Sequence, residues 1–216
     1  GRYRESKERQ VLLEPGTAVI LSDLGMSLAG AVLEIAAEEP FPALAERMVF
    51  APAGMTRTTF DPRLPAEWDP DLAQGYRWRG DSLAPVPYDY AMATPAAGAV
   101  STAADMGRLM SQLLGASVEV VGWDSARFLT SRQAANHREM RGQAYGFAER
   151  EVAGWTSWFR DGSAPGFSAH ISLMPELGLG VFVAANGGTT VGLAALSRTG
   201  RVTREFAEEL IRELWP

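Results

Sequence analysis

The spacing of apolar residues indicates a helix near the start of the chain. Large apolar residues recur there at intervals of three and four positions, the period of one helix face: Leu24, Leu28, Val32 and Ile35. Ser22 or Asp23 stands just before them. A short side-chain oxygen at that point can accept hydrogen bonds from the free backbone N–H groups of a first helical turn. The pattern predicts a helix that begins at Ser22 or Asp23.

Proline and glycine divide the next part of the chain. Pro42 suits the first turn of a helix, so a second helix is predicted from there to about Phe50. Residues 54–95 are rich in Pro, Asp, Gly and Trp. This composition predicts a long irregular segment with short strands, and such segments in compact domains are usually functional or poorly ordered.

Two more helices are predicted between residues 101 and 140. Ser101 or Thr102, followed by Asp105, resembles a capping box in which Asp replaces the usual Glu or Gln. The helix after it is expected to run to about Leu114. A short helix is also expected over residues 131–140.

The second half of the chain alternates apolar and polar residues, the period of a half-buried strand. Strands are predicted over 143–151, 155–160, 167–173 and 179–185. Pro165-Gly166 and the segment 175–178 are turn signals, so the last strands are expected to form an antiparallel meander. A final helix follows.

The final helix is expected to begin at Thr203 and to carry its apolar residues on one face: Phe206, Leu210, Ile211 and Leu214. Helices first, antiparallel strands next and a terminal helix last are typical of the α+β class. We expect one domain over 1–216, with a helical part over about 1–142 and the sheet and final helix over about 143–216.

Composition narrows the possible functions. The chain has 216 residues, a net charge of −6 and no cysteine, which excludes disulfides and thiolate chemistry and argues against nucleic acid as a partner. His137 and His170 are far apart in sequence, so neither a metal site nor a cofactor is expected. No apolar run reaches the roughly 18 residues that a transmembrane helix needs. Residues 1–10 are polar and do not resemble a signal peptide.

Four segments, taken together, resemble the serine β-lactamase and penicillin-binding-protein family. The matching segments are Glu14–Gly30, Pro52–Phe60, Pro95–Met106 and Gly162–Gly180, in the order in which that family has them. The similarity is nearest to class C β-lactamases, D-alanyl-D-alanine carboxypeptidases and related esterases. It implies a partial β-lactamase-like fold.

The resemblance also implies three catalytic elements, of which the first is absent. A serine in Ser-x-x-Lys acts as nucleophile beside its lysine. Lys7 is the only lysine, and Arg4 stands three residues before it, so this sequence contains no Ser-x-x-Lys. In the family this motif lies well before the Pro15-Gly16 segment. We therefore expect the chain to be a C-terminal portion, without the helix and first strands that accompany the motif.

The other two elements are present in altered form. The resemblance puts the family's Tyr-x-Asn tyrosine on Leu21 and its asparagine on Asp23, beside Ser22. It puts the cation of the third motif on Arg160, its glycine on Gly162 and the oxyanion-hole N–H on Ser163. Leucine cannot transfer a proton, whereas arginine can bind a carboxylate through two hydrogen bonds. These assignments predict a substrate groove formed by Ser22, Asp23, Arg160, Gly162 and Ser163.

Four of the five groove candidates also have a structural interpretation. Ser22 and Asp23 can cap a helix, and Gly162 can serve a turn. Arg160 can form a surface ion pair, for which the adjacent Asp161 is available. His170 is expected on the polar face of a strand, and His137 on an exposed helix.

Three hypotheses about function follow. The first is part of a serine hydrolase that cleaves an amide or ester through an acyl-enzyme and is inactive alone. The second is a non-catalytic protein that binds a carboxylate-bearing, peptide-like ligand. The third is a protein that uses this surface for assembly. A missing N-terminal half or a second copy of the chain is the expected protein partner, because a sheet edge and an apolar groove would otherwise be exposed.

Overall fold

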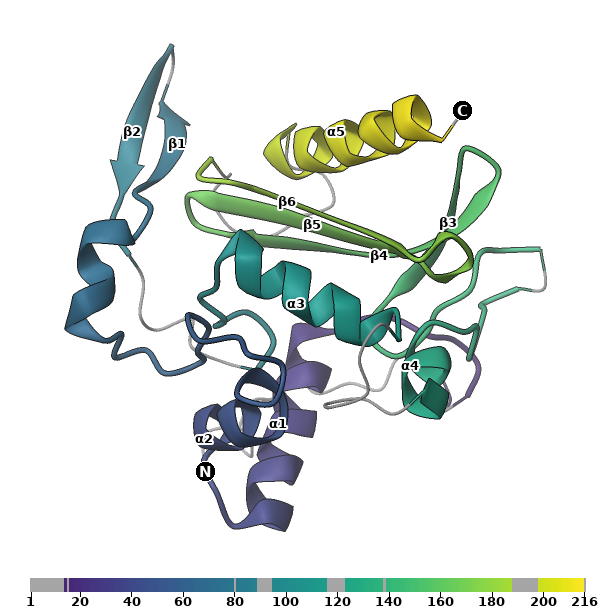
Figure 1. The fold of residues 1–216 in the computed structure, drawn as a ribbon, viewed down its shortest axis with the longest axis horizontal. Coiled ribbons are helices and arrows are strands. Elements are labelled where there is room, and N and C mark those ends of the chain that lie inside the picture. The colour runs from purple at the N-terminus through teal and green to yellow at the C-terminus, as the bar shows by residue number, and fades with distance from the viewer. Residues whose placement is uncertain are drawn as a thin grey trace.

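A computed structural model describes residues 14, 16–79, 81–88, 95–115, 123–137, 139–187 and 198–215. Its centre is an antiparallel sheet in the order β3-β4-β5-β6 (Figure 1). The strands are β3 Ala148–Val152, β4 Trp155–Ala164, β5 Phe167–Met174 and β6 Leu179–Ala185. The predicted meander is confirmed, and the strand expected over 179–185 has those bounds.

Helices cover both faces of this sheet. Helix α5, Arg198–Leu214, lies along one face, and helix α3, Ala103–Leu113, lies along the other (Figure 1). On the α5 side, Ile211 is buried with Val152 and Met174. On the α3 side, Leu113 is buried with Trp158, Leu173 and Ala144. The α+β class is therefore confirmed, with a C-terminal helix packed on the sheet.

The helical part begins with helix α1, Asp23–Ala37, whose N-cap is Ser22. Helix α2, Phe41–Ala45, continues directly into a π-helical turn, Glu46–Phe50, so the second predicted helix is also found. A small core holds this part together, in which Phe50 and Met55 are buried. The short helix α4, Trp123–Leu129, lies near the end of α3 (Figure 1).

The long segment predicted to be irregular contains little regular structure. A 3₁₀ helix, Ala66–Asp71, precedes a hairpin of strands β1, Gly75–Arg79, and β2, Ser82–Val86. The hairpin projects from the body of the molecule (Figure 1). Its base is held to the sheet, because the N–H of Tyr76 donates to the carbonyls of Asn186 and Gly166.

Three sequence predictions need correction. Residues 131–140 form no helix, because the Asn136 side chain bonds the backbone of Val19 and the backbone of Ala134 pairs with Gln143. The final helix begins at Arg198, and Thr203 is 2 % exposed inside it. Strand β3 begins at Ala148 rather than near 143.

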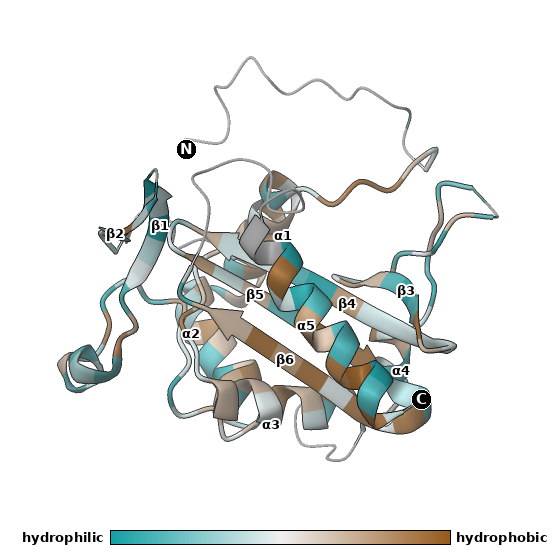
Figure 2. Cartoon of the chain, turned by 90° about the horizontal axis from the view of Figure 1, so that it is seen from above, coloured by the Kyte–Doolittle hydropathy of each residue, from teal (hydrophilic) through white to brown (hydrophobic). Residues whose placement is uncertain are grey.

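The apolar face predicted for the final helix is covered only in part. Ile211 is 1 % exposed, but Phe206 and Leu214 are each 58 % exposed. Viewed from above, α5 lies across the sheet while the mostly hydrophobic β6 runs beside it (Figure 2). Part of the apolar side of α5 is therefore open to solvent.

Asp105 joins the start of α3 to residues 57 and 58. Its carboxylate accepts hydrogen bonds from the Arg57 backbone N–H and the Thr58 hydroxyl, each at 2.8 Å, and pairs with Arg108 at 2.7 Å. Its own N–H donates to the Thr102 side chain at 3.2 Å, which confirms the predicted cap. Asp105 is 1 % exposed and Thr58 is 4 % exposed, so the hydrogen bond between them is shielded from water.

Replacing Asp105 should therefore be costly. Asp105→Ala leaves the Arg57 N–H without its acceptor and the buried Thr58 hydroxyl with only Ser101 Oγ, 2.8 Å away, and it removes the charged partner of Arg108. The free energy of unfolding should therefore fall by about 3 kcal/mol. Urea denaturation would measure the change. Asp61→Ala removes an exposed carboxylate paired with Arg63 and should cost less than about 1 kcal/mol. Equal losses in the two variants would contradict this account of Asp105.

Candidate functional site

Strand β4 presents alternate side chains to two different layers of the fold. Trp158 is packed with Leu113 of α3, so the side chains of its parity lie on the α3 side of the sheet. Arg160 and Gly162 share that parity. Asp161 has the opposite parity and points into the layer beneath α5, where its carboxylate is bound. The predicted residues Arg160 and Gly162 therefore share one face of one strand.

The outer half of β4 is a free edge within the described residues. The ladder between β3 and β4 ends at the pair Ala148–Phe159, whereas β4 stays paired with β5 as far as Ala164. Residues 160–164, which include Ser163, therefore have a ladder on one side only. Backbone groups at such an edge can pair with an extended ligand.

Arg160 keeps its charge available. It is half-buried, and no carboxylate of the described ranges forms an ion pair with it. The alternative interpretation, in which Arg160 pairs with Asp161, is not what the structure has, because the Asp161 carboxylate binds His170 and Arg204 instead. A half-buried cation without a protein partner is suited to an anionic ligand.

Gly162 lies within β4 and is exposed, so its interpretation as a turn glycine is wrong. The turn is made by Gly166, whose φ is +83°. A Cβ at Gly162 would lie 3.8 Å from the Cβ of Ala169, an ordinary contact. The fold does not need glycine here, and its effect is to leave the strand surface open.

Ser22 and Asp23 are placed differently from the other candidates. The Ser22 hydroxyl oxygen accepts the N–H of Gly25 at 3.3 Å, which is the capping role. Both residues are exposed, and no hydrogen bond or ion pair in the described part of the chain links them to β4. The segment before them is held by Asn136, whose side chain accepts the Val19 N–H at 2.6 Å and donates to the Val19 carbonyl at 3.2 Å. That these two residues form one groove with 160–163 stays a prediction.

A polar recess of about 250 Å³ lies beside the turn between β3 and β4, away from all five candidates. Its charged lining comprises Arg132, Glu139, Arg141, Glu149, Arg150 and Glu151. Arg132 and Glu149 form a two-bonded ion pair, with both contacts at 2.7 Å. Positive and negative side chains thus balance one another in the recess. The recess contains none of the five predicted groove residues.

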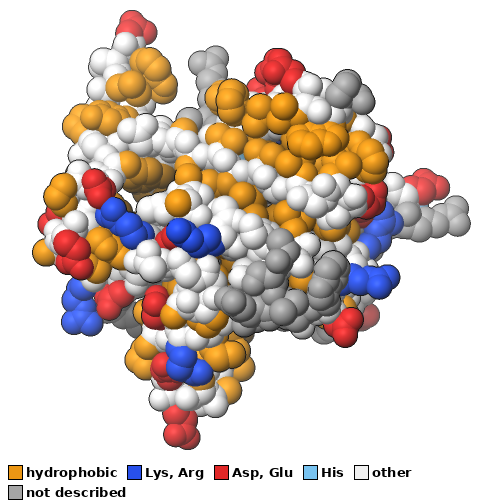
Figure 3. Space-filling model, in the orientation of Figure 1, with side chains coloured by type: hydrophobic (Ala, Val, Ile, Leu, Met, Phe, Trp, Pro, Cys, Tyr) orange, Lys and Arg blue, Asp and Glu red, His pale blue; other side chains and the backbone are white. Residues whose placement is uncertain are grey.

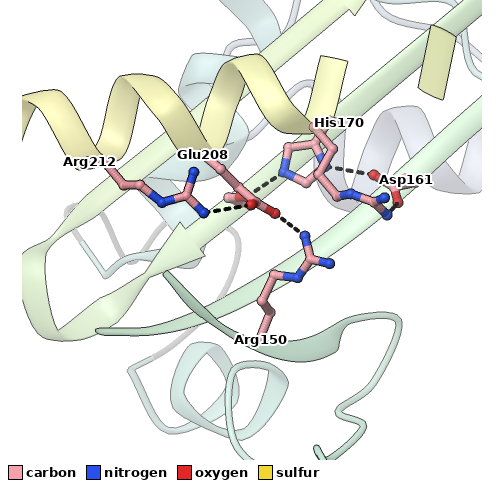
Figure 4. Close-up of polar contacts among 7 residues, drawn as sticks. Arg150, Asp161, His170, Glu208 and Arg212 are labelled. Carbon is pink, nitrogen blue, oxygen red and sulfur yellow. Dashed lines mark hydrogen bonds and ion pairs between the residues drawn. The ribbon is translucent and has the colours of Figure 1, made fainter. Parts of the chain in front are cut away.

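A buried polar layer lies on the opposite face of the sheet, beneath α5 (Figure 4). His170 is 1 % exposed; its Nδ1 lies 2.6 Å from Asp161 Oδ1 and its Nε2 lies 2.5 Å from Ser172 Oγ. Arg204 of α5 donates to Asp161 Oδ2 at 3.1 Å. The polar face of β5 predicted for His170 exists, but it is covered by α5. A Ser–His–Asp relay in this position has no exposed serine, since Ser172 is 3 % exposed.

A second set of charges extends the same layer (Figure 4). Glu208 of α5 accepts hydrogen bonds from Arg150 of β3 and, at 3.0 Å, from Arg212. Burial, followed by the positive charge of Arg204, lowers the pKa of Arg150. The layer fastens α5 to the sheet through charges as well as through Ile211.

The sequence contained a signal for this layer. Ser168, His170 and Ser172 alternate along β5, a pattern normally assigned to a solvent face. Arg204, Glu208 and Arg212 follow at helical spacing in the final helix. The polar face of β5 and the charged face of the final helix are complementary, which indicates that the two faces pack against each other and are buried.

No three His, Asp or Glu side chains within the described ranges gather as ligands for a metal ion. No helix in the same ranges is both long and apolar enough to span a bilayer.

The family model Beta-lactamase matches residues 4–202. The chain therefore belongs to the Beta-lactamase family. A human protein, beta-lactamase-like 1, is 28 % identical over 97 % of this chain and 42 % of its own length.

Solved structures agree on the fold. The octameric penicillin-binding protein homologue from Pyrococcus abyssi has a TM-score of 0.78 at 19 % identity, covering 94 % of this chain and 44 % of that one. The class C β-lactamase from Rhodobacter sphaeroides has a TM-score of 0.66 at 18 % identity, covering 88 % and 59 %. The D-amino acid amidase from Ochrobactrum anthropi SV3 has a TM-score of 0.70 at 18 % identity, covering 93 % and 59 %. The chain thus spans about half the length of these relatives.

The ion pair in the recess predicts a pH dependence of stability. The hydrogen bond from Arg132 lowers the pKa of Glu149. A carboxyl whose pKa is lower when folded stabilises the fold above its unfolded pKa, and this stabilisation is lost as pH falls through the folded pKa. Glu149→Gln should therefore lose less thermal stability than the wild-type chain between pH 7 and pH 3. Parallel Tm curves over that range would contradict the assignment.

Proposed function

We propose that this chain is the substrate-binding part of a serine hydrolase that cleaves an amide or ester through an acyl-enzyme. Its Beta-lactamase-family fold supports the reaction class. The observation that carries the proposal is Arg160, a half-buried cation without a described protein partner, beside Gly162 on the free edge of β4. An extended substrate with a carboxylate would pair with the strand edge and bind the guanidinium.

The nucleophile has to come from outside this sequence, because it contains no Ser-x-x-Lys. Ser22 is engaged as a helix cap. Ser172 has an adjacent histidine but is 3 % exposed beneath α5. By itself the chain is therefore expected to bind substrate without turning it over.

Uncovered apolar surface supports a polypeptide partner. The segment through α1 exposes many large apolar side chains: Ile20, Leu24, Leu28, Val32, Leu33 and Ile35, with exposures of 51–79 %. Apolar helices of this kind are normally buried. Hydrophobic side chains gather on the lobe formed by α1 and α2 and again along α5 and β6 (Figure 3). The proposed partner is an N-terminal polypeptide that carries the nucleophile. The relatives are long enough to contain such a portion in addition to the part that matches this chain.

Reconstitution tests the proposed reaction. Separately produced segments that carry Ser-x-x-Lys, cut from the relatives named above, should associate with this chain and become acylated by penicillin or a fluorophosphonate, as read by intact mass. Replacing the motif serine with alanine should abolish the adduct. If no segment associates, or if acylation is independent of this chain, the proposal fails.

A second candidate function is ligand binding without catalysis, which Leu21 and Arg160 favour because neither residue suits proton transfer. Arg160→Ala should weaken binding of an acyl-D-alanine peptide about 10- to 100-fold, through the loss of charge-assisted hydrogen bonds. Titration calorimetry would measure the change. Arg63→Ala, which removes a guanidinium 92 % exposed, should bind as the wild type does. Equal binding by the Arg160 variant would remove the basis of both candidate functions.

The isolated chain should also self-associate. Exposed apolar side chains on α1 favour association in water, so light scattering after gel filtration should give a mass that rises with concentration. Leu28→Glu combined with Ile35→Glu should reduce that rise, whereas Arg63→Glu should not. A monodisperse monomer at every concentration would argue against α1 as an interface.

A further inference from the structure

The outer half of β4 lacks one of the two constraints that fix an inner strand. Among the residues that the structure describes, 160–164 pair with β5 alone, because β3 ends opposite Phe159. A strand with one ladder is free to twist about that ladder and to fray. Arg160, Gly162 and Ser163 all lie in this half, so their orientation needs a second support.

Asp161 receives that support from two other elements. Its Oδ1 lies 2.6 Å from His170 Nδ1 on β5, and its Oδ2 accepts a hydrogen bond from Arg204 of α5 at 3.1 Å. Its side chain is 15 % exposed, and that of Arg204 is 19 % exposed. Ion pairs shielded from water to this degree are weakened less by salt than surface pairs are.

His170 is itself held in place. Ser172 Oγ lies 2.5 Å from its Nε2, and the Phe159 ring stacks on it with centroids 5.9 Å apart. Arg150 in turn lies over Phe159, 5.2 Å from the ring centroid. The imidazole is therefore held in one orientation, and its hydrogen bond holds the Asp161 carboxylate in place.

From this geometry we infer that Asp161, His170 and Arg204 are positioning residues for the Arg160 face of β4. Strand alternation makes the coupling direct. Asp161 stands between Arg160 and Gly162, so fixing its side chain beneath α5 sets the rotation of both neighbours on the opposite face. The C-terminal helix thus determines how the proposed substrate-binding edge is presented. The ligand-binding consequence rests on the proposed function, whereas the structural one does not.

Hydrogen exchange of the full chain tests the inference without a ligand. Arg204→Ala should raise the exchange rate of those amides of 160–164 that donate to β5 about tenfold, while the hydrogen-bonded amides of 155–159 and of β6 change by less than about twofold. Arg212→Ala is the matched control: it removes a guanidinium from the same helix that binds Glu208 but not Asp161, and it should leave 160–164 unchanged. Asp161→Asn keeps the size of the side chain, should reproduce the local effect and serves if Arg204→Ala does not fold.

Three outcomes would overturn the inference. Exchange at 160–164 that is unchanged in both Arg204→Ala and Asp161→Asn would do so. A uniform rise over the whole sheet would assign the residues to global stability alone, and an equal effect of Arg212→Ala would remove the role of Asp161.

Calorimetry with an acyl-D-alanine peptide separates this inference from the proposed function. Where the wild type binds, Arg204→Ala should weaken binding several-fold, more than Arg212→Ala. A wild-type chain that does not bind the peptide would count against the proposed function, and the exchange data would still decide the positioning role.

Discussion

The structure depends on the two-residue alternation of one strand, β4. Odd-numbered side chains from Phe159 to Asp161 enter the polar layer beneath α5, and even-numbered ones from Trp158 to Gly162 face the α3 side. A shift of one residue in register would exchange the two sets. It would place the Arg160 guanidinium in the layer that already holds Arg204 and remove Asp161 from its bonds with His170 and Arg204. The pairing of β4 with β5 from Trp158 to Ala164 prevents that shift.

Two carboxylates, the buried Asp105 and the partly buried Asp161, connect the elements around this strand. Asp161 ties the sheet to α5, and Asp105 ties the start of α3 to residues 57 and 58. Each accepts several charged or backbone donors, the arrangement in which a buried charge is tolerated. Apolar surface remains open on α1 and on the flank of α5. The molecule thus combines a sheet held by polar contacts with exposed apolar surface on two helices.

Local chemistry made much of the fold predictable from the sequence. The Ser22 and Thr102 caps, the turn at Gly166 and the bounds of β6 each depend on residues close together in the chain. The helix expected over 131–140 failed because Asn136 forms its hydrogen bonds with Val19, 117 residues away. The burial of His170 was missed for the same reason, since the polar face of β5 is covered by a helix that begins 28 positions later at Arg198.

The candidate site shows the same contrast between local features, which the sequence predicts, and long-range contacts, which it does not. Arg160, Gly162 and Ser163 are consecutive or alternate residues of one strand, so sequence placed them together. Whether Ser22 and Asp23 join them depends on long-range packing that local patterns do not encode. The roles of Asp161 and Arg204 could not be predicted, because these residues are 43 positions apart and meet only where α5 packs on the sheet.

The central claim is that this chain provides a binding strand and no working nucleophile. Intact-mass analysis of the folded chain, alone, after incubation with a fluorophosphonate and separately with a penicillin tests it most directly. The account predicts an unchanged mass with both reagents. An adduct that peptide mapping assigns to Ser22, Ser163 or Ser172 would contradict it, because a reactive serine would then exist within this sequence.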